Sequence, residues 1–187
     1  TKISGLPENQ IMGSGTILDT ARLRYGLSEH FKVAQGNIHA YVFGEHGDTS
    51  FIPWTGAYIS GLSTDEYYEE MKAHGKDVKP LDKEAMLEYV QKSGGKVIAK
   101  KGATFYAVSA TVCQLVGLIL AASDSLATVS SMLHGEYGIE DVCLSTLTLV
   151  GPNGIQGKVQ MRMNKEEVAL LKKSADALKE VIAQIEL

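Results

Sequence analysis

Three side chains in two short segments could together transfer a proton and hold an anion. Residues 43–49 read FGEHGDT, which places His46 between two glycines, and residues 18–24 read LDTARLR, with Asp19 three positions before Arg22. An imidazole, with an ordinary pKa of about 6.5, exchanges protons near neutral pH. A carboxylate on its other nitrogen fixes the tautomer and stabilises the charged form. A guanidinium binds a carboxylate through two parallel hydrogen bonds, which lysine cannot reproduce.

Each of these features also has a simpler interpretation. On a helix, Asp19 and Arg22 could form an ordinary surface ion pair, worth roughly a few tenths of a kcal/mol. A lone histidine is often structural, although the flanking glycines would let a ligand approach the ring of His46 closely. A metal site is not favoured, because Glu45, His46 and Asp48 point in alternate directions on an extended segment and no second histidine is near.

Length and composition indicate one soluble globular domain. The chain has 187 residues, of which 44% are hydrophobic and 21% charged. A net charge of -4 argues against nucleic acid or an anionic membrane as the main partner. The longest apolar run, around residues 116–122, is too short to span a bilayer. Cys113 and Cys143 lie among apolar residues, so we expect buried, reduced thiols and a cytoplasmic protein.

The elements that must position the three side chains are predicted from hydrophobic periodicity. Helical spacing after the GSGT segment predicts a helix over residues 17–31. Residues 39–43 alternate as in a strand, which would stop at Gly44. Residues 64–73 have Thr64 as the expected N-cap and an acidic first turn, which predicts a short exposed helix.

The second half of the chain changes from helical to strand periodicity and back. A helix is expected to begin within residues 82–91, and residues 103–122, apolar on nearly every face, predict a central buried helix. Residues 141–150 and 155–163 predict two strands of a hairpin around the GPNG turn.

The last helix has the clearest signature. Asn164 is its expected N-cap, with Glu167 as the capping-box partner. Strands and helices that do not alternate regularly favour an α+β fold over a doubly wound sheet. The apolar stripe of this helix consists of Val168, Leu171, Ala175, Leu178, Ile182 and Ile185.

The segment GSGTIL at residues 13–18 does not match a dinucleotide-binding fingerprint. Leu18 stands where the third glycine belongs, and no acidic residue follows at the required distance after a strand. Binding of a dinucleotide through its pyrophosphate is therefore expected to lie elsewhere.

The segments GSGTILDTARLR, NIHAYVFGEHGDTSFIPW and KGATFYAV, in this order and spacing, resemble the second half of L-lactate dehydrogenases. LDTAR and GEHGD are shared with the related malate dehydrogenases. The resemblance covers essentially residues 1–187 and implies the α+β C-terminal domain of that family, with antiparallel strands, a long buried helix and a C-terminal amphipathic helix. Residues 1–13 would be the join to an N-terminal Rossmann NAD-binding domain that is absent from this chain.

The resemblance assigns roles to the first three residues. It implies that His46 donates the proton to the keto oxygen of pyruvate and accepts it in the reverse reaction. Asp19 would orient the imidazole and raise its pKa. Arg22 would hold the substrate carboxylate.

Five further residues receive roles from the resemblance alone. Thr104 would lie beside the small end of the substrate, and Ser14 and Val108 would contact the nicotinamide of NAD. Arg24 and His39 match positions that bind fructose 1,6-bisphosphate across a subunit interface in activated bacterial lactate dehydrogenases. Two ordinary exposed cations are the alternative for this last pair.

The resemblance thus implies an NAD-dependent L-lactate dehydrogenase, a homotetramer in the intact enzyme. The pattern from Ser14 to Arg24 favours lactate, but malate dehydrogenase stays open because the loop that selects the substrate belongs to the front half. A third possibility is an inert assembly domain. We expect the isolated chain to be inactive, because the binding site of the hydride donor lies outside it.

Overall fold

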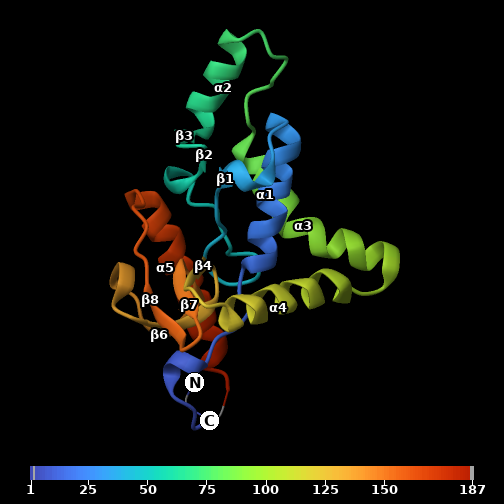
Figure 1. Ribbon diagram of the computed structural model, residues 1–187. Coiled ribbons are helices and arrows are strands. Elements are labelled where there is room, and N and C mark those ends of the chain that lie inside the picture. Colours follow the sequence, from blue (N-terminus) through green and yellow to red (C-terminus); the bar gives the residue numbers. More distant parts are fainter. Residues whose placement is uncertain (2, 186–187) are drawn as a thin grey trace.

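The computed structural model describes residue 1 and residues 3–185; residues 2, 186 and 187 of the predicted domain 1–187 lie outside the described part. The described residues form short antiparallel strands and five α-helices (Figure 1), which confirms the α+β class. The helices are α1 (Ile17–Phe31), α2 (Thr64–Ala73), α3 (Lys83–Lys101), α4 (Phe105–Leu120) and α5 (Lys165–Ile182). The strands are β1 (Ile38–His39), β2 (Tyr58–Ile59), β3 (Leu62–Ser63), β4 (Ser125–Ala127), β5 (Ser130–His134), β6 (Glu140–Ser145), β7 (Thr148–Gly151) and β8 (Gly154–Lys158).

The strands form three small sheets, ordered β1-β2-β3, β4-β7-β8 and β5-β6. Three hydrophobic clusters pack around them. The first joins α1 and α3 to β1 and β2, the second joins α5 to β5 and β6, and the third joins α1 and α4 to β4 and β7. Val42 belongs to the first cluster and the adjacent Phe43 to the second. The segment that leads to His46 therefore passes from the first cluster to the second.

Helix α1 confirms the prediction for residues 17–31. Leu23, Leu27 and Phe31 follow one another at four-residue spacing and are buried, so one face of the helix packs into the core. The helix ends where Lys32 adopts a left-handed conformation with φ of 54°.

The strand predicted over residues 39–43 is mostly wrong. Regular pairing is confined to β1, and Phe43 forms only an isolated bridge with Phe51. The reason lies in α1, whose threonine side chains bond the backbone of Val42: its C=O accepts from Thr16 and its N–H donates to Thr20. These side chains take the backbone groups that a neighbouring strand would otherwise pair.

The predicted strand over residues 141–150 is two strands, β6 and β7, which belong to different sheets. The hairpin around the GPNG turn is confirmed as β7 paired with β8. Gly154 has a φ of 82°, which glycine tolerates without steric cost.

The N-cap of α2 is Ser63 rather than Thr64, so that prediction is wrong by one residue. The hydroxyl of Ser63 accepts a hydrogen bond from the backbone N–H of Glu66 at 3.2 Å, and the Glu66 carboxylate accepts one from the backbone N–H of Ser63 at 2.8 Å. This reciprocal capping box satisfies two backbone donors at once.

The apolar helix predicted over residues 103–122 is present as α4, but the prediction that it is buried is wrong for this chain. Only Thr111 and Leu115 are buried, since α1 and β7 cover just one side of the helix. Figure 1 shows α3 and α4 as a helical hairpin that projects from the rest of the molecule. The exposed apolar side chains of α4 are Phe105, Tyr106, Val108, Val112, Val116 and Leu120.

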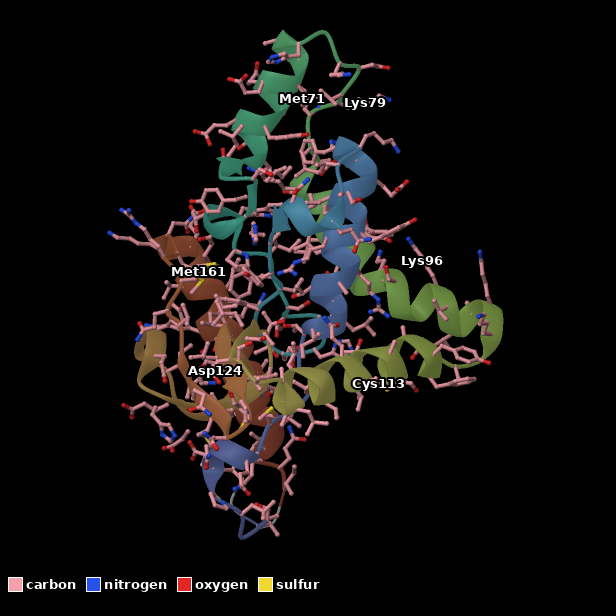
Figure 2. The ribbon with its side chains drawn as sticks, viewed as in Figure 1. Met71, Lys79, Lys96, Cys113, Asp124 and Met161 are labelled. Carbon is pink, nitrogen blue, oxygen red and sulfur yellow. The ribbon has the colours of Figure 1, made fainter. Side chains whose placement is uncertain are left out.

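The expectation of two buried thiols is wrong for Cys113, which is exposed on α4 (Figure 2). Cys143, on β6, is half-buried. Among the described residues, no helix combines the length and the apolar character needed to cross a bilayer.

Helix α5 confirms the predicted capping box. The Asn164 side chain accepts from the backbone N–H of Glu167 at 2.9 Å, and the Glu167 carboxylate accepts from the backbone N–H of Asn164 at 3.0 Å. Leu171 and Ala175 of the predicted stripe are buried in the second cluster. Ser174, a polar residue on this buried face, is also fully enclosed.

Candidate active site

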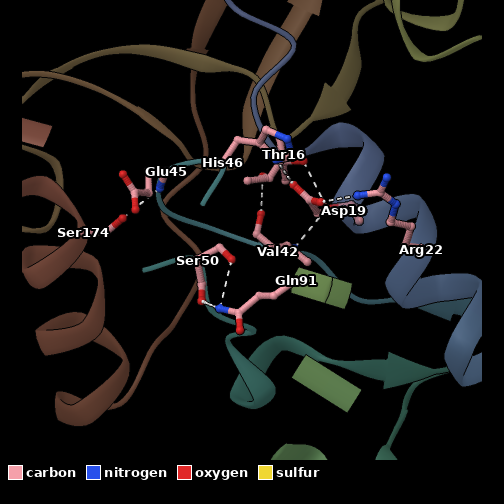
Figure 3. Close-up of polar contacts among 11 residues, drawn as sticks. Thr16, Asp19, Arg22, Val42, Glu45, His46, Ser50, Gln91 and Ser174 are labelled. Carbon is pink, nitrogen blue, oxygen red and sulfur yellow. Dashed lines mark hydrogen bonds and ion pairs between the residues drawn. The ribbon is translucent and has the colours of Figure 1, made fainter. Parts of the chain in front are cut away.

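Asp19 brings His46 and Arg22 together at the first turn of α1 (Figure 3). Its Oδ2 lies 2.6 Å from Nδ1 of His46, and its Oδ1 accepts a hydrogen bond from Nη1 of Arg22 at 3.1 Å. The Asp19 side chain is only 6% exposed, whereas that of His46 is 62% exposed. The simpler interpretation of a surface ion pair does not describe this arrangement, because the shared carboxylate is buried and bonds a residue from a second segment.

The hydrogen bond to Asp19 raises the pKa of His46 above its ordinary value. Partial burial of the ring lowers this pKa, the negative charge of Asp19 raises it further, and the positive charge of Arg22 lowers it. Because the carboxylate bonds Nδ1, the opposite nitrogen, Nε2, is the one left to exchange a proton with a ligand.

The Arg22 guanidinium is bonded to the protein only through Nη1 among the described residues. Its side chain is 15% exposed, and among the described residues it makes a single hydrogen bond, to Asp19. Gly94 of α3 lies beside it, and a Cβ at that glycine would be 3.8 Å from Nη2 of Arg22. The remaining N–H donors of Arg22 are therefore available for an anionic ligand.

The register between α1 and the His46 segment is set by two threonines that bracket Asp19. The Thr16 hydroxyl donates to the C=O of Val42 at 2.5 Å, and the N–H of Val42 donates to the Thr20 hydroxyl at 3.0 Å. Thr16 is the N-cap of α1, and Asp19 and Thr20 lie in its first turn, so the same end of the helix holds the backbone of Val42 and supplies the carboxylate. The sequence showed both threonines in TILDT, but not what they bind.

Residues 44–50 form a loop that presents His46. An isolated β-bridge between Phe43 and Phe51 joins the two ends of the loop, and Gly44 forms another with Ser145 of β6. Ser174 of α5 and Gln91 of α3 contact the loop from two sides (Figure 3). Sequence reasoning missed both residues; the only signal for Ser174 was a hydroxyl within an apolar stripe.

The structure gives Gly44 a different role from the one expected of the flanking glycines. Gly44 has a φ of 96°, and a Cβ there would lie 2.7 Å from Oγ of Ser174. The missing side chain makes room for a neighbouring helix. Internal packing, rather than ligand approach, explains this glycine.

A cavity of about 610 Å³ opens beside His46. Predicted residue Ser14 lines it together with Gly13 and Gly15. Ser145 also lines it, but its hydroxyl oxygen is buried and has no hydrogen-bond partner among the described residues. Much of the remaining wall is apolar and includes Met132, Val142, Leu178 and Ile182.

Thr104 and Val108 are not among the described residues that line this cavity. Thr104 is the N-cap of α4, in the connection between α3 and α4, and Val108 is exposed one turn further on. Their roles beside substrate and nicotinamide stay predictions.

Arg24 and His39 lie near each other in the fold, on α1 and β1. The Nε of Arg24 donates to the C=O of Ala40 at 3.1 Å, and its guanidinium lies 5.0 Å from the ring centre of Tyr41. His39, which precedes Ala40, is exposed.

The described residues contain no group of three or more His, Cys, Asp or Glu side chains that could hold a metal ion.

Replacing Asp19 with asparagine is expected to lower the pKa of His46, because both the hydrogen bond to a charged acceptor and the negative charge disappear. NMR titration of the histidine ring protons in the 187-residue chain measures this directly, with exposed His39 as an internal reference. A raised folded-state pKa adds stability below the ordinary pKa of histidine, and this stability is lost as pH rises through the folded-state value. The difference in free energy of unfolding between wild type and Asp19→Asn should therefore shrink as pH rises from the ordinary pKa of histidine through the folded-state pKa of His46. An unchanged His46 titration would contradict the ion pair.

Comparison with known proteins agrees with the fold. Residues 16–186 match the lactate/malate dehydrogenase α/β C-terminal domain, so the chain belongs to the lactate/malate dehydrogenase family. L-lactate dehydrogenase from Acetivibrio thermocellus is 45% identical over 100% of this chain, and L-lactate dehydrogenase 1 from Clostridium acetobutylicum is 42% identical over 98%. The chain spans 58% of the length of each of these relatives.

Solved structures show the same fold. An L-lactate dehydrogenase from Clostridium thermocellum superposes with a TM-score of 0.88 at 35% identity, covering 100% of this chain and 60% of the other. The minor L-lactate dehydrogenase from Enterococcus mundtii, in a ligand-bound form, gives a TM-score of 0.90 at 30% identity, covering 100% and 58% respectively.

Proposed function

We propose that this chain is the substrate-binding and catalytic part of an NAD-dependent L-lactate dehydrogenase that interconverts pyruvate and L-lactate in the cytoplasm. The observation that carries the proposal is the buried Asp19 carboxylate, which bonds His46 on one oxygen and Arg22 on the other. The L-lactate dehydrogenases among its relatives support the reaction class.

His46 supplies the proton. In pyruvate reduction its Nε2 gives a proton to the carbonyl oxygen as negative charge develops there, and in lactate oxidation it takes the hydroxyl proton. Asp19 keeps the proton-bearing tautomer in place and stabilises the imidazolium. NAD, when bound, exchanges a hydride with the substrate carbon.

Arg22 supplies the anion site. Its free N–H donors can form two parallel hydrogen bonds with the substrate carboxylate, which fixes the keto carbon relative to His46. Thr104 is proposed to limit the space at the other end of the substrate, which requires the tip of the α3–α4 hairpin to lie closer to His46 in the intact enzyme.

The cavity beside His46 fits a nicotinamide ring. Its apolar wall suits the faces of the ring, and Ser14 offers a hydroxyl as a polar partner to a carboxamide. Val108, also proposed to contact the nicotinamide, would have to approach with the same hairpin. Residues 1–13 are proposed to join this domain to the part that binds the rest of NAD.

Turnover by a fusion protein tests this proposal. The chain would be joined to the nucleotide-binding part of the Acetivibrio thermocellus relative and assayed for NADH oxidation with pyruvate and with oxaloacetate. We expect a higher kcat/KM with pyruvate, and no turnover by the 187-residue chain alone. A preference for oxaloacetate would instead support malate dehydrogenase. A folded fusion protein that turns over neither substrate would support the inert assembly domain.

Arg24 and His39 are proposed to bind fructose 1,6-bisphosphate in a homotetramer. The closeness of Arg24 to the strand that carries His39 favours a shared phosphate site, since a guanidinium and an imidazolium both donate to phosphate. Activation curves of the fusion protein, with and without His39→Ala, test it. Identical curves would contradict the effector site.

A further inference from the structure

The orientation of the His46 ring depends on the loop that carries it. The side chain of His46 is 62% exposed, and its one hydrogen bond among the described residues is the one to Asp19. Little packing therefore fixes the ring itself. A shift in the backbone of residues 44–50 would carry the imidazole away from the carboxylate.

Ser174 of α5 holds this loop from within. Its hydroxyl oxygen accepts a hydrogen bond from the backbone N–H of Glu45 at 2.8 Å (Figure 3). It accepts a second one from the Thr49 hydroxyl at 2.9 Å. Glu45 precedes His46 directly, and Thr49 lies three residues after it. One fully buried oxygen thus ties together the two sides of the loop.

The contact between Ser174 and the loop is matched in shape as well as in hydrogen bonding. Oγ of Ser174 occupies the space that a side chain at Gly44 would need, and the positive φ of Gly44 turns the backbone N–H of Glu45 toward it. Gln91 of α3 secures the far half of the loop, where its Nε2 donates to the C=O groups of Asp48 and Ser50 at 3.2 and 3.0 Å.

We propose that Ser174 is a positioning residue for His46, acting through the backbone of residues 44–49. It touches neither the imidazole nor the substrate site proposed above. Its loss leaves the Glu45 N–H without its acceptor and frees the loop on the side that faces α5. The consequence for activity rests on the proposed function, whereas the consequence for the Asp19–His46 pair does not.

The first experiment uses the 187-residue chain and needs no activity. NMR titration compares wild type, Ser174→Ala and Thr111→Ala, the last of which removes a buried hydroxyl from α4, away from the loop. In Ser174→Ala the pKa of His46 should fall toward its ordinary value as the hydrogen bond to Asp19 is populated less, and the amide signals of Glu45 and Thr49 should broaden or shift. In Thr111→Ala the His46 titration should match wild type.

A folded Ser174→Ala chain whose His46 titration matches wild type would overturn the proposal. If Ser174→Ala does not fold, Ser174→Cys decides, because it conserves the shape of the side chain and weakens the acceptor. A fall in the His46 pKa of this variant supports the proposal, and an unchanged value overturns it.

The second experiment measures turnover by the fusion protein. Ser174→Ala should lower kcat about 10- to 100-fold, in the range expected for a misplaced catalytic group, with the KM for pyruvate changed less than about twofold. If a His46 variant is inactive while Ser174→Ala keeps the wild-type kcat, the positioning role fails and the proposed function stands. If the His46 variant keeps its activity, the proposed function fails, and the NMR result alone judges Ser174.

Discussion

Replacing His46 with glutamine is expected to lower kcat/KM for pyruvate reduction by about 10²- to 10⁴-fold, the usual contribution of a positioned general acid. The glutamine amide can still donate a hydrogen bond to the carbonyl oxygen, but it cannot transfer a proton at neutral pH. The keto oxygen would then take its proton from water, which can reach position 46 because the His46 side chain is 62% exposed. Steady-state rates of NADH oxidation by the fusion protein give the measurement.

His74→Gln provides a matched control for the His46 variant. His74 is an exposed histidine at the C-terminal end of α2, whose Nδ1 lies 2.7 Å from the C=O of Glu70. Its replacement should leave both kcat and KM unchanged. A His46→Gln enzyme within about twofold of wild type would mean that the proton comes from another group, and the proposed mechanism would be wrong.

The helices that position the site could be predicted because their signals are local. Apolar spacing over residues 17–31 and the Asn164–Glu167 capping box need no knowledge of the remaining chain. The prediction of a strand over residues 39–43 was mostly wrong because its signals are not local. Its backbone partners are the hydroxyls of Thr16 and Thr20, and no periodicity within the segment reveals them.

Burial of α4 could not be predicted from its composition alone. A helix that is apolar on every face requires partners on every face, and within this chain α1 and β7 cover only one side. The chain spans 58% of the length of the relatives named above, so the surface that α4 exposes here can be covered in a protein of their full length.

The sequence predicted the residues of the candidate site that could do chemistry, but not the residues that hold the His46 loop in place. Asp19, Arg22 and His46 stood out because their side chains suit proton transfer and anion binding, and the structure brings them together. Ser174 and Gln91 contribute single hydroxyl and amide groups whose importance depends on where α5 and α3 pack. Such contacts join residues more than 40 positions apart in the sequence, and for Ser174 about 130.

Two replacements of Arg22 distinguish the effect of its positive charge from the effect of its paired hydrogen bonds. Arg22→Gln should lower kcat/KM for pyruvate by about 10²- to 10³-fold, because a charge-assisted pair with the substrate carboxylate, worth about 3–4 kcal/mol when broken, is lost. Arg22→Lys should recover only part of this loss, since an ammonium is a point charge that cannot form two parallel hydrogen bonds with a carboxylate. Most of the change should appear in KM, because the carboxylate is bound equally in substrate and transition state.

The pKa of His46 provides a second measurement on the same variants. The positive charge of Arg22 lowers this pKa, so in the 187-residue chain Arg22→Gln should raise it, whereas Arg22→Lys, which keeps the charge near Asp19, should change it little. A substrate carboxylate bound to Arg22 would neutralise the same charge, so binding of the anion should favour the protonated imidazole that pyruvate reduction needs. If Arg22→Lys matches wild type in KM, charge alone holds the substrate. If Arg22→Gln leaves both KM and the His46 titration unchanged, Arg22 does not belong to the site.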